Sequence, residues 1–487
     1  MNLIVVSNRL PYAASKTENG WTIEPGSGGL VTALRPVLSN RGGRWIGWTG
    51  AEEDLPGAEQ AFAGSRHRLG YELVPLTLRP KEREGFYHGF SNEILWPLFH
   101  DLLPHCHFDP SYWWTYEAVN RKFAEVAARH SGPEDFIWVH DYHLMTMGRE
   151  LRELNVRSRI AFFLHIPFPP LDIFLKLPWR FPILRALLDF DLIGFQTMRD
   201  RRNFLQCVRL LLPGAEVSGK GPVLTVALEG RKVRVGAFPI SIDVEEFEHR
   251  AAEPEVRAKA ASLRQDEPDR KIVLGVDRLD YTKGIPEKLE AFRTLLTRRP
   301  DLCGQVTLFQ VVVPSREYVP RYSEHRIAIE RLVGQINGQF TRSGWVPIHY
   351  IYRSLEGPRL PAYYLAADVA LVTPLKDGMN LVSKEYCATR VQEDGALVLS
   401  EFAGAAAQLQ QGAFLVNPFD VEGVAMTLER AIRLPPAEQW LRMRRLRQAV
   451  RDYDIYHWVD SFLRAAVSKE LADFPIVEDY LPEAASR

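Results

Sequence analysis

The sequence is poor in cysteine, and its four cysteines lie far apart along the chain. They form no CxxC pair, which argues against a disulfide framework and favours a reducing compartment. Apolar runs are also short, and none reaches the roughly 18 residues that a membrane-spanning helix needs. The amino terminus is apolar but has no basic leader, so it indicates a buried strand rather than a signal peptide. We therefore expect a cytoplasmic protein without a membrane partner.

Neither sign of charge is in excess. The 60 lysine and arginine residues nearly balance the 61 aspartate and glutamate residues, for a formal net charge of -1. Nucleic acid is therefore not expected as a partner, and any anion site has to be built locally. The triplet His105-Cys106-His107 could suggest a metal, but three adjacent side chains cannot all point at one ion from a regular strand or helix. We expect no metal and no cofactor.

Short apolar runs alternate with amphipathic stretches throughout the chain. At 487 residues the chain is too long for one core, so two domains of roughly 200–250 residues are expected. Short apolar runs bounded by Gly, Pro or Asp indicate buried parallel strands. We expect such strands at Leu3–Ser7, Phe136–His140, Arg159–His165, Leu192–Gln196, Val233–Phe238, Lys271–Val276, Val306–Val313, His349–Tyr352, Val369–Thr373, Ala396–Ser400 and Phe414–Val416.

This alternation predicts an α/β protein with two doubly wound, Rossmann-like domains that face each other across a cleft. We expect the first domain to span residues 1–242 and the second to span residues 243–454. A carboxyl-terminal helix, at about 455–487, is expected to pack back on the first domain. Ligands of such folds bind at the carboxyl ends of the strands, so the functional residues are expected there.

One loop of the second half, residues 276–284, follows an expected strand and precedes an expected helix. Its sequence, Val-Asp-Arg-Leu-Asp-Tyr-Thr-Lys-Gly, places Arg278 and Lys283 five residues apart. Such a pair can clamp a diphosphate and neutralise its charge without a metal. A solvated loop with an internal Arg–Asp pair is the alternative interpretation.

A second loop, residues 373–385, occupies the same kind of position. Asp377 stands in a tight Asp-Gly turn, where its carboxylate could accept from sugar hydroxyls. Glu385 lies in the following helix, where it could take the two hydroxyls of a ribose. An N-cap followed by a surface glutamate would explain the same residues.

The first half offers a glycine-rich loop and a set of aromatic residues. Gly26-Ser27-Gly28-Gly29-Leu30 runs into a helical stretch, where a phosphate could approach the backbone, although a flexible turn explains it as well. Trp138–Leu144 (WVHDYHL) and Leu164–Pro169 (LHIPFP) each end an expected strand. Aromatic faces with interleaved polar groups suit a sugar, while His140 and His165 could each be satisfied core histidines.

Together these motifs resemble those of the trehalose-6-phosphate synthases, glycosyltransferase family 20. The resemblance runs in order from about residue 3 to residue 470, nearly the whole chain. It rests on Val6–Pro11 (VSNRLP), Ser27–Leu30 (SGGL), Trp138–Leu144, Leu164–Pro169, Arg278–Gly284 (RLDYTKG), Asp377–Glu385 (DGMNLVSKE) and Leu399–Gly404 (LSEFAG). It implies the GT-B fold and a retaining glucosyltransferase, EC 2.4.1.15-like, for trehalose biosynthesis. Nucleotide-glucose, with UDP-glucose preferred, and glucose 6-phosphate would give α,α-trehalose 6-phosphate and a nucleoside diphosphate.

The resemblance also implies roles for individual residues. The expected catalytic residues are Arg278, Lys283, Asp377 and His165. The expected acceptor-binding residues are Arg9, Tyr87, Trp96, Asp141 and Arg316, with Arg9 and Arg316 on the phosphate. The expected donor-binding residues are Gly28, Gly29, Arg278, Lys283, Leu355, Asp377, Gly378, Met379, Asn380, Leu381, Val382 and Glu385.

Two alternatives stay open at this point. One is a related synthase with another phosphorylated acceptor, which would make glucosylglycerol phosphate, but Arg9 favours glucose 6-phosphate. The other is a catalytically silent, sugar-phosphate-sensing homologue, against which the presence of Arg9, Arg278, Lys283, Asp377 and Glu385 together argues. The expected partners are small-molecule substrates. The sequence leaves the donor base (UDP, GDP or ADP), a homo-oligomeric state and regulation open.

Overall fold

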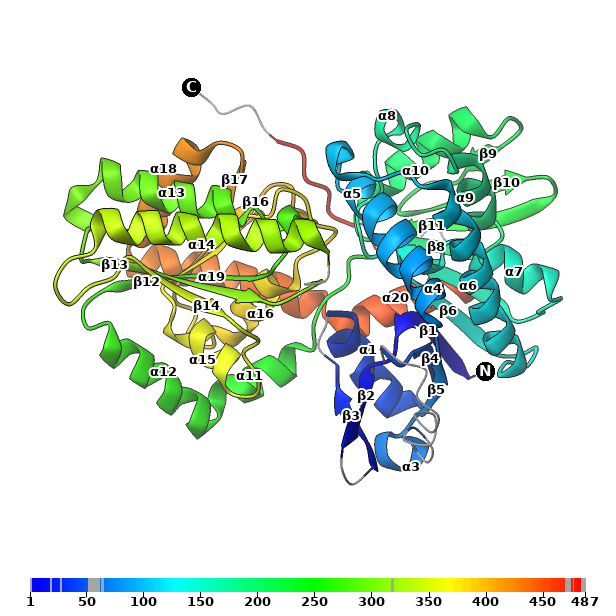
Figure 1. The fold of residues 1–487 in the computed structure, drawn as a ribbon, viewed down its shortest axis with the longest axis horizontal. Helices are drawn as coiled ribbons and strands as arrows, with labels where there is room; N and C mark the ends of the chain where they lie inside the picture. Colours follow the sequence, from blue (N-terminus) through cyan, green and yellow to red (C-terminus); the bar gives the residue numbers. More distant parts are fainter. Residues whose placement is uncertain are drawn as a thin grey trace. The chain divides into compact units, whose positions relative to one another are not determined.

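The apolar run at the amino terminus forms β1 (Leu3–Arg9), an interior strand of a nine-stranded sheet. The side chains from Ile4 to Val6 are fully buried, as expected of a strand that is covered on both faces. The structure is a computed structural model and describes residues 2–17, 20–26, 29–50, 62, 65–316, 319–468, 474–475 and 477–482 (Figure 1). Two units make up the chain: unit 1 is Met1–Ile240 with Ile455–Val477, and unit 2 is Ser241–Asp454 with Glu478–Arg487.

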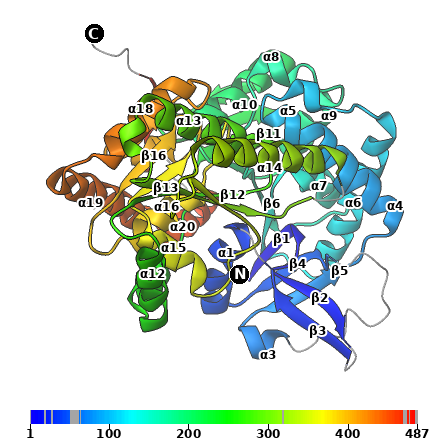
Figure 2. The ribbon, with the colours of Figure 1, turned by 60° about the vertical axis from the view of Figure 1, so that its left-hand side comes forward.

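The unit 1 sheet has the strand order β5-β4-β1-β6-β7-β8-β11-β10-β9. The strands from β5 to β11 in this order are parallel, and β10 and β9 continue the sheet in antiparallel fashion. Their bounds are β4 (Arg44–Trp48), β5 (Glu72–Leu76), β6 (Phe136–His140), β7 (Arg159–Phe163), β8 (Leu192–Phe195), β9 (Glu216–Ser218), β10 (Val223–Leu228) and β11 (Arg231–Ala237). A separate hairpin consists of β2 (Tyr12–Thr17) and β3 (Gly20–Pro25) (Figure 2).

The helices of unit 1 connect and cover these strands. They are α1 (Gly29–Arg41), α3 (Ser65–Leu69), α4 (Pro80–Glu82), α5 (Trp96–Phe99), α6 (Pro110–Arg129), α7 (Met147–Glu153), α8 (Leu171–Phe174), α9 (Arg180–Leu187), α10 (Met198–Leu211) and α20 (Ile455–Val467), with the 3₁₀ turns η2 (Leu103–His105) and η3 (Tyr142–Leu144). Between α4 and α5 lies η1 (Arg83–Leu95), a 13-residue π-helix. Because π-helices are rare and concentrate at functional sites, η1 marks the part of unit 1 that carries Tyr87.

Unit 2 contains an all-parallel sheet with the order β14-β13-β12-β15-β16-β17. Its strands are β12 (Lys271–Arg278), β13 (Val306–Val313), β14 (Ile348–Tyr352), β15 (Val369–Val372), β16 (Ala396–Ser400) and β17 (Phe414–Val416). Its helices are α11 (Val244–Ala252), α12 (Pro254–Asp266), α13 (Ile285–Arg298), α14 (Pro320–Phe340), α15 (Arg359–Ala366), α16 (Leu381–Thr389), α17 (Ala406–Leu409), α18 (Val421–Ile432) and α19 (Pro436–Asp452), with the turns η4 (Tyr281–Lys283) and η5 (Pro300–Leu302).

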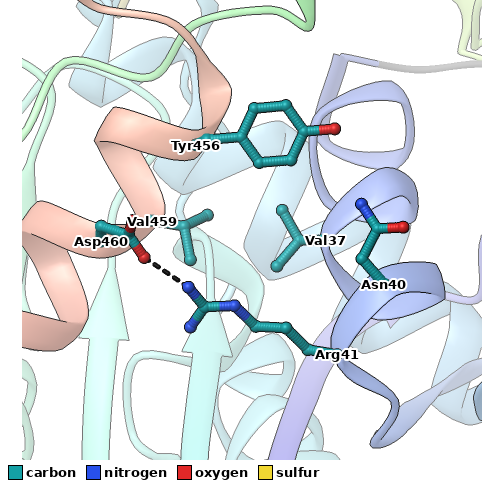
Figure 3. A pocket seen from close by; sticks show the side chains of 6 residues that line it. All are labelled: Val37, Asn40, Arg41, Tyr456, Val459 and Asp460. Atoms are coloured by element: carbon teal, nitrogen blue, oxygen red, sulfur yellow. Dashed lines mark hydrogen bonds and ion pairs between the residues drawn. The ribbon is translucent and has the colours of Figure 1, made fainter.

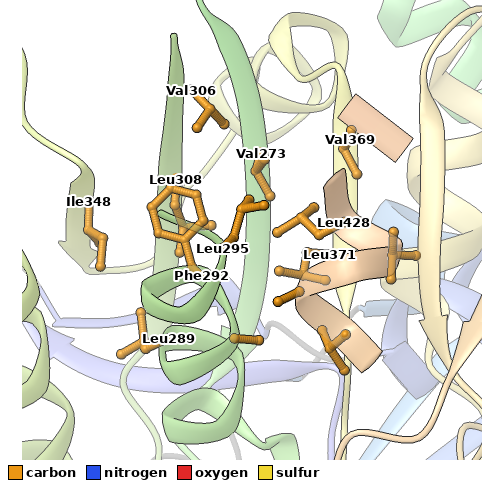
Figure 4. Packing of buried hydrophobic residues seen from close by; sticks show 14 of the residues in the cluster. Val273, Leu289, Phe292, Leu295, Val306, Leu308, Ile348, Val369, Leu371 and Leu428 are labelled. Atoms are coloured by element: carbon orange, nitrogen blue, oxygen red, sulfur yellow. The ribbon is translucent and has the colours of Figure 1, made fainter. Parts of the chain in front are cut away.

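The core of unit 2 lies between its sheet and the helices α13 and α18 (Figure 4). Phe292 and Leu295 of α13 belong to the same buried cluster as Val273 of β12 and Leu308 of β13. Leu428 joins this cluster from α18. Full burial of each such side chain contributes about 1.5–3 kcal/mol, so this layer fixes α13, and with it the loop that leads into α13.

The predicted α/β class with two doubly wound sheets is confirmed, and each expected strand is present within a few residues of its predicted bounds. Strands β4 and β5, which extend the unit 1 sheet beyond β1, were not expected from the sequence, and neither was the hairpin of β2 and β3. Among the described residues, no helix is both long and apolar enough to cross a membrane.

Candidate active site

The loop after β12 carries its cations at the carboxyl edge of the unit 2 sheet. β12 ends at Arg278, which pairs with the last residue of β13. Because both strands end at the same edge, the segment with Arg316 begins beside the loop with Lys283. Gly284 turns the chain into α13 with a φ of 62°. A Cβ at Gly284 would lie 2.5 Å from the carbonyl oxygen of Thr373, so this turn requires glycine.

Two carboxylates hold these cations. Lys283 Nζ lies 2.5 Å from Asp377 Oδ2, and Arg316 Nη1 lies 3.5 Å from Asp280 Oδ2. Asp280 is 1% exposed, and burial alone would raise the pKa of its carboxyl group. The positive charges of Arg316, Arg278 and Lys283 nevertheless bring the pKa of Asp280 below its ordinary value. Three of the predicted site residues are thus gathered around one ionised carboxylate.

A buried polar network joins the start of the same loop to α13 and β13. Lys288 Nζ of α13 lies 2.5 Å from Asp277 Oδ2, and both side chains are at most 1% exposed. Gln310 Nε2 of β13 donates to the same oxygen of Asp277 over 2.9 Å. A Cβ at Gly275 would lie 2.3 Å from Gln310 Oε1, so the network leaves no room for a larger residue there. Since Asp277 directly precedes Arg278, this network fixes the backbone from which Arg278 projects.

The segment 377–382 leads from Asp377 into the first turn of α16. Asn380 adopts a φ of 82°, and its Oδ1 accepts from the N–H of Ser383 over 3.1 Å as the N-cap. Asn380 Nδ2 also donates to Asp377 Oδ2 over 3.2 Å. A Cβ at Gly404 would lie 1.9 Å from the carbonyl oxygen of Gly378, so the 403–405 segment packs directly on this turn.

The remaining predicted residues of this segment continue into the helix. The carbonyl oxygen of the buried Met379 accepts from the N–H of Ala405 over 2.8 Å. Leu381 and Val382 are the first two residues of α16. The first N–H groups of a helix have no partner within the helix and face the positive end of its dipole, so this end favours an anion.

Glu385 is not the surface glutamate of the alternative interpretation. Its Oε2 accepts from the hydroxyl of Tyr364 over 2.7 Å. Burial raises the pKa of Glu385, while the Tyr364 hydrogen bond and the charge of Arg250 lower it. Leu355, the residue expected beside the nucleotide base, is 8% exposed.

In unit 1, Arg9 at the end of β1 lies against aromatic rings. Its guanidinium carbon is 4.9 Å from the centroid of Trp48 and 5.2 Å from that of Tyr87. Tyr87 in turn stacks on His143, with ring centroids 5.9 Å apart and an interplanar angle of 13°. A guanidinium over aromatic faces is oriented without a carboxylate partner being required, so its charge stays available for an anion.

Hydrogen bonds of neutral groups join η1 to the segment after β6. The main-chain carbonyl of Tyr87 accepts from Asn92 Nδ2 over 2.7 Å, and the Tyr142 hydroxyl donates to Asn92 Oδ1 over 3.0 Å. Trp96, the predicted wall of the acceptor pocket, lies with its ring centroid 5.7 Å from that of Tyr142. Tyr142 therefore holds both Trp96, through the ring contact, and the main chain at Tyr87, through Asn92, although Tyr87 and Trp96 are nine residues apart.

Asp141 and His165 contact each other directly. Asp141 adopts a φ of 76°, and its Oδ1 accepts from the His165 N–H over 3.2 Å. The His165 ring has its Nε2 3.0 Å from His140 Nδ1 and its Nδ1 3.4 Å from Gln196 Nε2. Because Gln196 Oε1 accepts from the Ile240 N–H over 2.9 Å, Gln196 Nε2 is the donor to His165, which assigns the Nε2–H tautomer to His165.

These two histidines are neutral; His140 is fully buried, and His165 is half-buried. Burial lowers the pKa of His165 to about 3, and burial together with the neighbouring His165 lowers the pKa of His140 well below its ordinary value. A sugar that bonds to the His165 ring has to replace one of its two protein partners. His140 is a core histidine, as the alternative interpretation allowed.

The predicted site residues therefore fall into two local groups. Arg278, Lys283, Arg316 and Asp377 come together in unit 2, and Arg9 with Tyr87, and Asp141 with His165, come together in unit 1. Arg316 belongs to unit 2, whereas the other predicted acceptor residues belong to unit 1. Gly29 is the first residue of α1. Gly28 lies outside the described residues.

Sequence reasoning missed the groups that hold these residues. Asp280 was visible only as one partner of a possible internal Arg–Asp pair, and Asp277 with Lys288 was not singled out. Tyr322, which contacts Arg316, lies in α14 with no motif around it. The alternation Trp45-Ile46-Gly47-Trp48 was the available signal for β4, which brings Trp48 to Arg9.

The chain is similar to one family along almost its whole length. The model of glycosyltransferase family 20 matches residues 1–468. A protein of Mycolicibacterium gilvum (strain PYR-GCK), described as trehalose-6-phosphate synthase, is 45% identical over 477 residues, which cover 96% of this chain and 94% of that protein.

Solved structures agree with this similarity. An α,α-trehalose-phosphate synthase (UDP-forming) from Burkholderia xenovorans, in complex with glucose-6-phosphate, superposes with a TM-score of 0.86 and 35% identity over 96% of this chain and 100% of that one. A structure described as trehalose-6-phosphate from E. coli bound with UDP-2-fluoro glucose gives a TM-score of 0.84 and 35% identity over 96% and 99% of the two chains. These likenesses confirm the predicted GT-B fold.

Proposed function

The chain belongs to glycosyltransferase family 20, and from this premise we propose that it transfers glucose from UDP-glucose to glucose 6-phosphate, with retention of configuration, giving α,α-trehalose 6-phosphate and UDP. The observation that carries the proposal is the loop with Arg278 and Lys283 at the carboxyl end of β12, where Asp280 lies 3.5 Å from Arg316 and Lys283 lies 2.5 Å from Asp377. Substrates with a diphosphate and a phosphate need such cations. The ligands of the B. xenovorans and E. coli structures, glucose-6-phosphate and UDP-2-fluoro glucose, support the same pair of substrates.

In this proposal, unit 2 binds the donor. Arg278 and Lys283 contact the diphosphate, and the first amide groups of α16, at Leu381 and Val382, support it through the helix dipole. Glu385 accepts the ribose hydroxyls. The nucleotide base lies against Leu355, while Asp377, Gly378, Met379 and Asn380 form the turn that borders the transferred glucose. Gly28 and Gly29 allow the diphosphate to approach the backbone closely.

A second set of residues is proposed to bind the acceptor. Arg9 and Arg316 contact the phosphate, for which a guanidinium offers two parallel N–H donors. Tyr87 and Trp96 provide faces for the sugar ring, and Asp141 accepts from its hydroxyls. Since Arg9 is backed by the rings of Trp48 and Tyr87, its charge is directed at the acceptor rather than at a carboxylate of the protein.

The chemical step is a front-face substitution. The anomeric hydroxyl oxygen of glucose 6-phosphate forms a bond to the anomeric carbon of the donor glucose, on the face from which UDP leaves. The bond from that carbon to the β-phosphate oxygen breaks, and the acceptor proton passes to the departing phosphate. Arg278 and Lys283 stabilise the charge that develops on the diphosphate, while Asp377 and His165 position the glucose, so the step needs no protein nucleophile.

One incubation matrix tests this proposal. UDP-, GDP- and ADP-glucose are each combined with glucose 6-phosphate and with glycerol 3-phosphate, in the presence of EDTA, and the products are identified by NMR. We expect UDP-glucose and glucose 6-phosphate to give an α,α-linked product. The proposal fails if glycerol 3-phosphate is the preferred acceptor, if the product is not α,α-linked, or if no pair reacts.

The role of the cations is tested by Arg278→Ala. Loss of one preorganised charge that acts on the transition state costs about 10²–10³ in kcat, so we expect a loss of that size with an unchanged melting temperature. Near-normal turnover of this variant would show that the proposed mechanism is wrong.

A further inference from the structure

The main chain at Arg316 is strained. Arg316 follows β13 and has a φ of 50°, in the left-handed region that residues with a Cβ avoid. Such a conformation is strained and persists only where surrounding contacts impose it. The carbonyl oxygen of Arg316 accepts from the N–H of Val319 over 2.9 Å, which closes the turn into α14. The contacts of the side chain then decide where the guanidinium points.

Two buried groups hold that guanidinium. Arg316 Nη1 donates to the hydroxyl of Tyr322 over 2.5 Å and lies 3.5 Å from Asp280 Oδ2. The Arg316 side chain is only 9% exposed, and Tyr322 is 2% exposed. The Tyr322 hydroxyl, in turn, lies 3.5 Å from Asp280 Oδ2 and is the donor of that pair. Arginine, tyrosine and aspartate therefore form a closed triangle.

Asp280 is itself fixed by its own loop. Its Oδ1 accepts from the N–H of Thr282 over 3.0 Å and from the Thr282 hydroxyl over 2.9 Å. This leaves Oδ2 facing Arg316 and Tyr322. Because Asp280 stands between Arg278 and Lys283 in the sequence, the loop proposed to bind the donor diphosphate also carries the carboxylate that orients Arg316. Nothing in the sequence motifs pointed to Tyr322.

We propose that Tyr322 and Asp280 are positioning residues that hold Arg316 for the acceptor phosphate, and that Asp280 thereby joins the acceptor-phosphate site to the donor loop. The inference rests on the proposed function, because it assigns the Arg316 guanidinium to glucose 6-phosphate. Tyr322 contacts Arg316 and Asp280 through its hydroxyl, and its ring packs on Tyr281 of the donor loop with centroids 5.4 Å apart. The hydroxyl of Tyr322 is therefore assigned to the acceptor, and its ring to packing on the donor loop. Asp280 acts on both substrates.

The two roles are separated by Tyr322→Phe and Asp280→Asn. Tyr322→Phe keeps the ring and removes the hydroxyl that accepts from Arg316 and donates to Asp280. Loss of these contacts to charged groups corresponds to a rise in the KM for glucose 6-phosphate of about ten-fold. We expect the KM for UDP-glucose and kcat to stay within about two-fold of the wild-type values. Asp280→Asn is expected to raise the KM values of both substrates. Melting temperatures identify any variant that fails to fold.

Tyr350→Phe is the matched control. Tyr350 lies on β14 of the same sheet, and its buried hydroxyl has no hydrogen-bond partner among the residues that the structure describes, so removal of that hydroxyl is expected to leave both KM values unchanged. Calorimetric titration of glucose 6-phosphate into the enzyme saturated with UDP gives a second readout. We expect a ten-fold weaker Kd for Tyr322→Phe and an unchanged Kd for Tyr350→Phe.

Arg316→Ala distinguishes a failure of this inference from a failure of the proposed function. If Arg316→Ala leaves the KM for glucose 6-phosphate unchanged, the assignment of Arg316 to the acceptor phosphate is wrong. If Arg316→Ala raises that KM while Tyr322→Phe does not, the assignment holds and the positioning role of Tyr322 is overturned. Equal effects of Tyr322→Phe on both substrates would also overturn the inference, because a general loss of packing would then be the cause.

Discussion

The two units hold their candidate site residues by different physical means. In unit 2, buried carboxylates face buried cations: Asp277 pairs with Lys288, and the ionised Asp280 is surrounded by arginine and lysine. In unit 1, Arg9 lies on aromatic rings, and His165 is a neutral ring between His140 and Gln196. In the proposed function, the ion pairs of unit 2 hold the cations that meet the charge developing on the leaving diphosphate, whereas the aromatic rings of unit 1 orient Arg9 without a carboxylate.

The largest effect on stability is expected when one charge of a buried ion pair in unit 2 is removed. Lys288→Met leaves the Asp277 carboxylate buried without its cation, and loss of one partner of a buried pair costs about 3–5 kcal/mol. We expect the free energy of unfolding of unit 2 to fall by that amount in urea denaturation. The double variant Asp277→Leu/Lys288→Met is the control, since an apolar pair is often as stable as a buried ion pair. A single variant within about 1 kcal/mol of wild type would contradict the role of this pair.

The pH dependence of stability distinguishes the two units, because each contains a base whose pKa is lowered by burial, and the two bases titrate in different pH ranges. Burial lowers the pKa of Lys384 to about 7 from its ordinary 10.5. The folded state therefore holds fewer protons than the unfolded state between these values, so the free energy of unfolding rises with pH in this window. From pH 7 to pH 9 the expected rise is about 2 kcal/mol. Burial likewise lowers the pKa of His165 from its ordinary 6.5 to about 3 in the folded state. Its contribution to the free energy of unfolding therefore rises with pH between these two values, below pH 6.5.

Lys384→Met is the variant that checks this assignment. The free energy of unfolding of this variant is measured in urea at pH 7, 8 and 9. It should rise less steeply with pH than that of the wild type, because the contribution of Lys384 is absent. The difference between wild type and variant is the quantity of interest, since other groups titrate equally in both. Parallel pH profiles of wild type and variant would show that Lys384 does not titrate in this range.

A neutral hydrogen bond in unit 1 is expected to matter less than a buried charge in unit 2. The Tyr116 hydroxyl donates to the carbonyl of Tyr142 over 2.7 Å and accepts from the N–H of Met145 over 3.0 Å. Tyr116→Phe leaves two buried main-chain groups unpaired and should cost about 1–3 kcal/mol of unfolding free energy. Tyr112→Phe, whose hydroxyl lies 3.4 Å from Glu93 at a partly exposed position, should cost below about 0.5 kcal/mol. Equal losses of unfolding free energy for both variants would contradict the expectation that burial of the hydrogen bond determines its contribution.

A small effect is also expected from an exposed ion pair of unit 1. Arg41 of α1 and Asp460 of α20 pair beside a small pocket that Val37, Tyr456 and Val459 also line (Figure 3). Their side chains are 51% and 65% exposed. Because solvent screens such pairs, Asp460→Asn should change the free energy of unfolding by at most about 1 kcal/mol, and less in high salt. A loss comparable to that of Lys288→Met would show that exposure does not govern these ion pairs.

Periodicity and local motifs predicted the strands and the cations, because both are properties of short segments. The run Lys271–Val276 was an expected strand, and Arg278 and Lys283 were expected at its end. The long-range contacts could not be predicted: Tyr322 is 42 residues from Asp280, and Gln196 is 31 residues from His165. Strand β4 was not expected from the sequence; in the structure Trp45 is fully buried, whereas Trp48 lies against Arg9.

The most direct test of the division between the units is a calorimetric comparison of two arginine variants. The Kd values of UDP, and of glucose 6-phosphate in the presence of UDP, are measured for Arg278→Ala and Arg9→Ala. We predict that Arg278→Ala weakens UDP binding by at least about ten-fold, whereas Arg9→Ala leaves UDP binding within about two-fold and weakens glucose 6-phosphate binding. If Arg9→Ala weakens UDP binding as much as Arg278→Ala does, the assignment of donor and acceptor phosphates to different arginines is wrong.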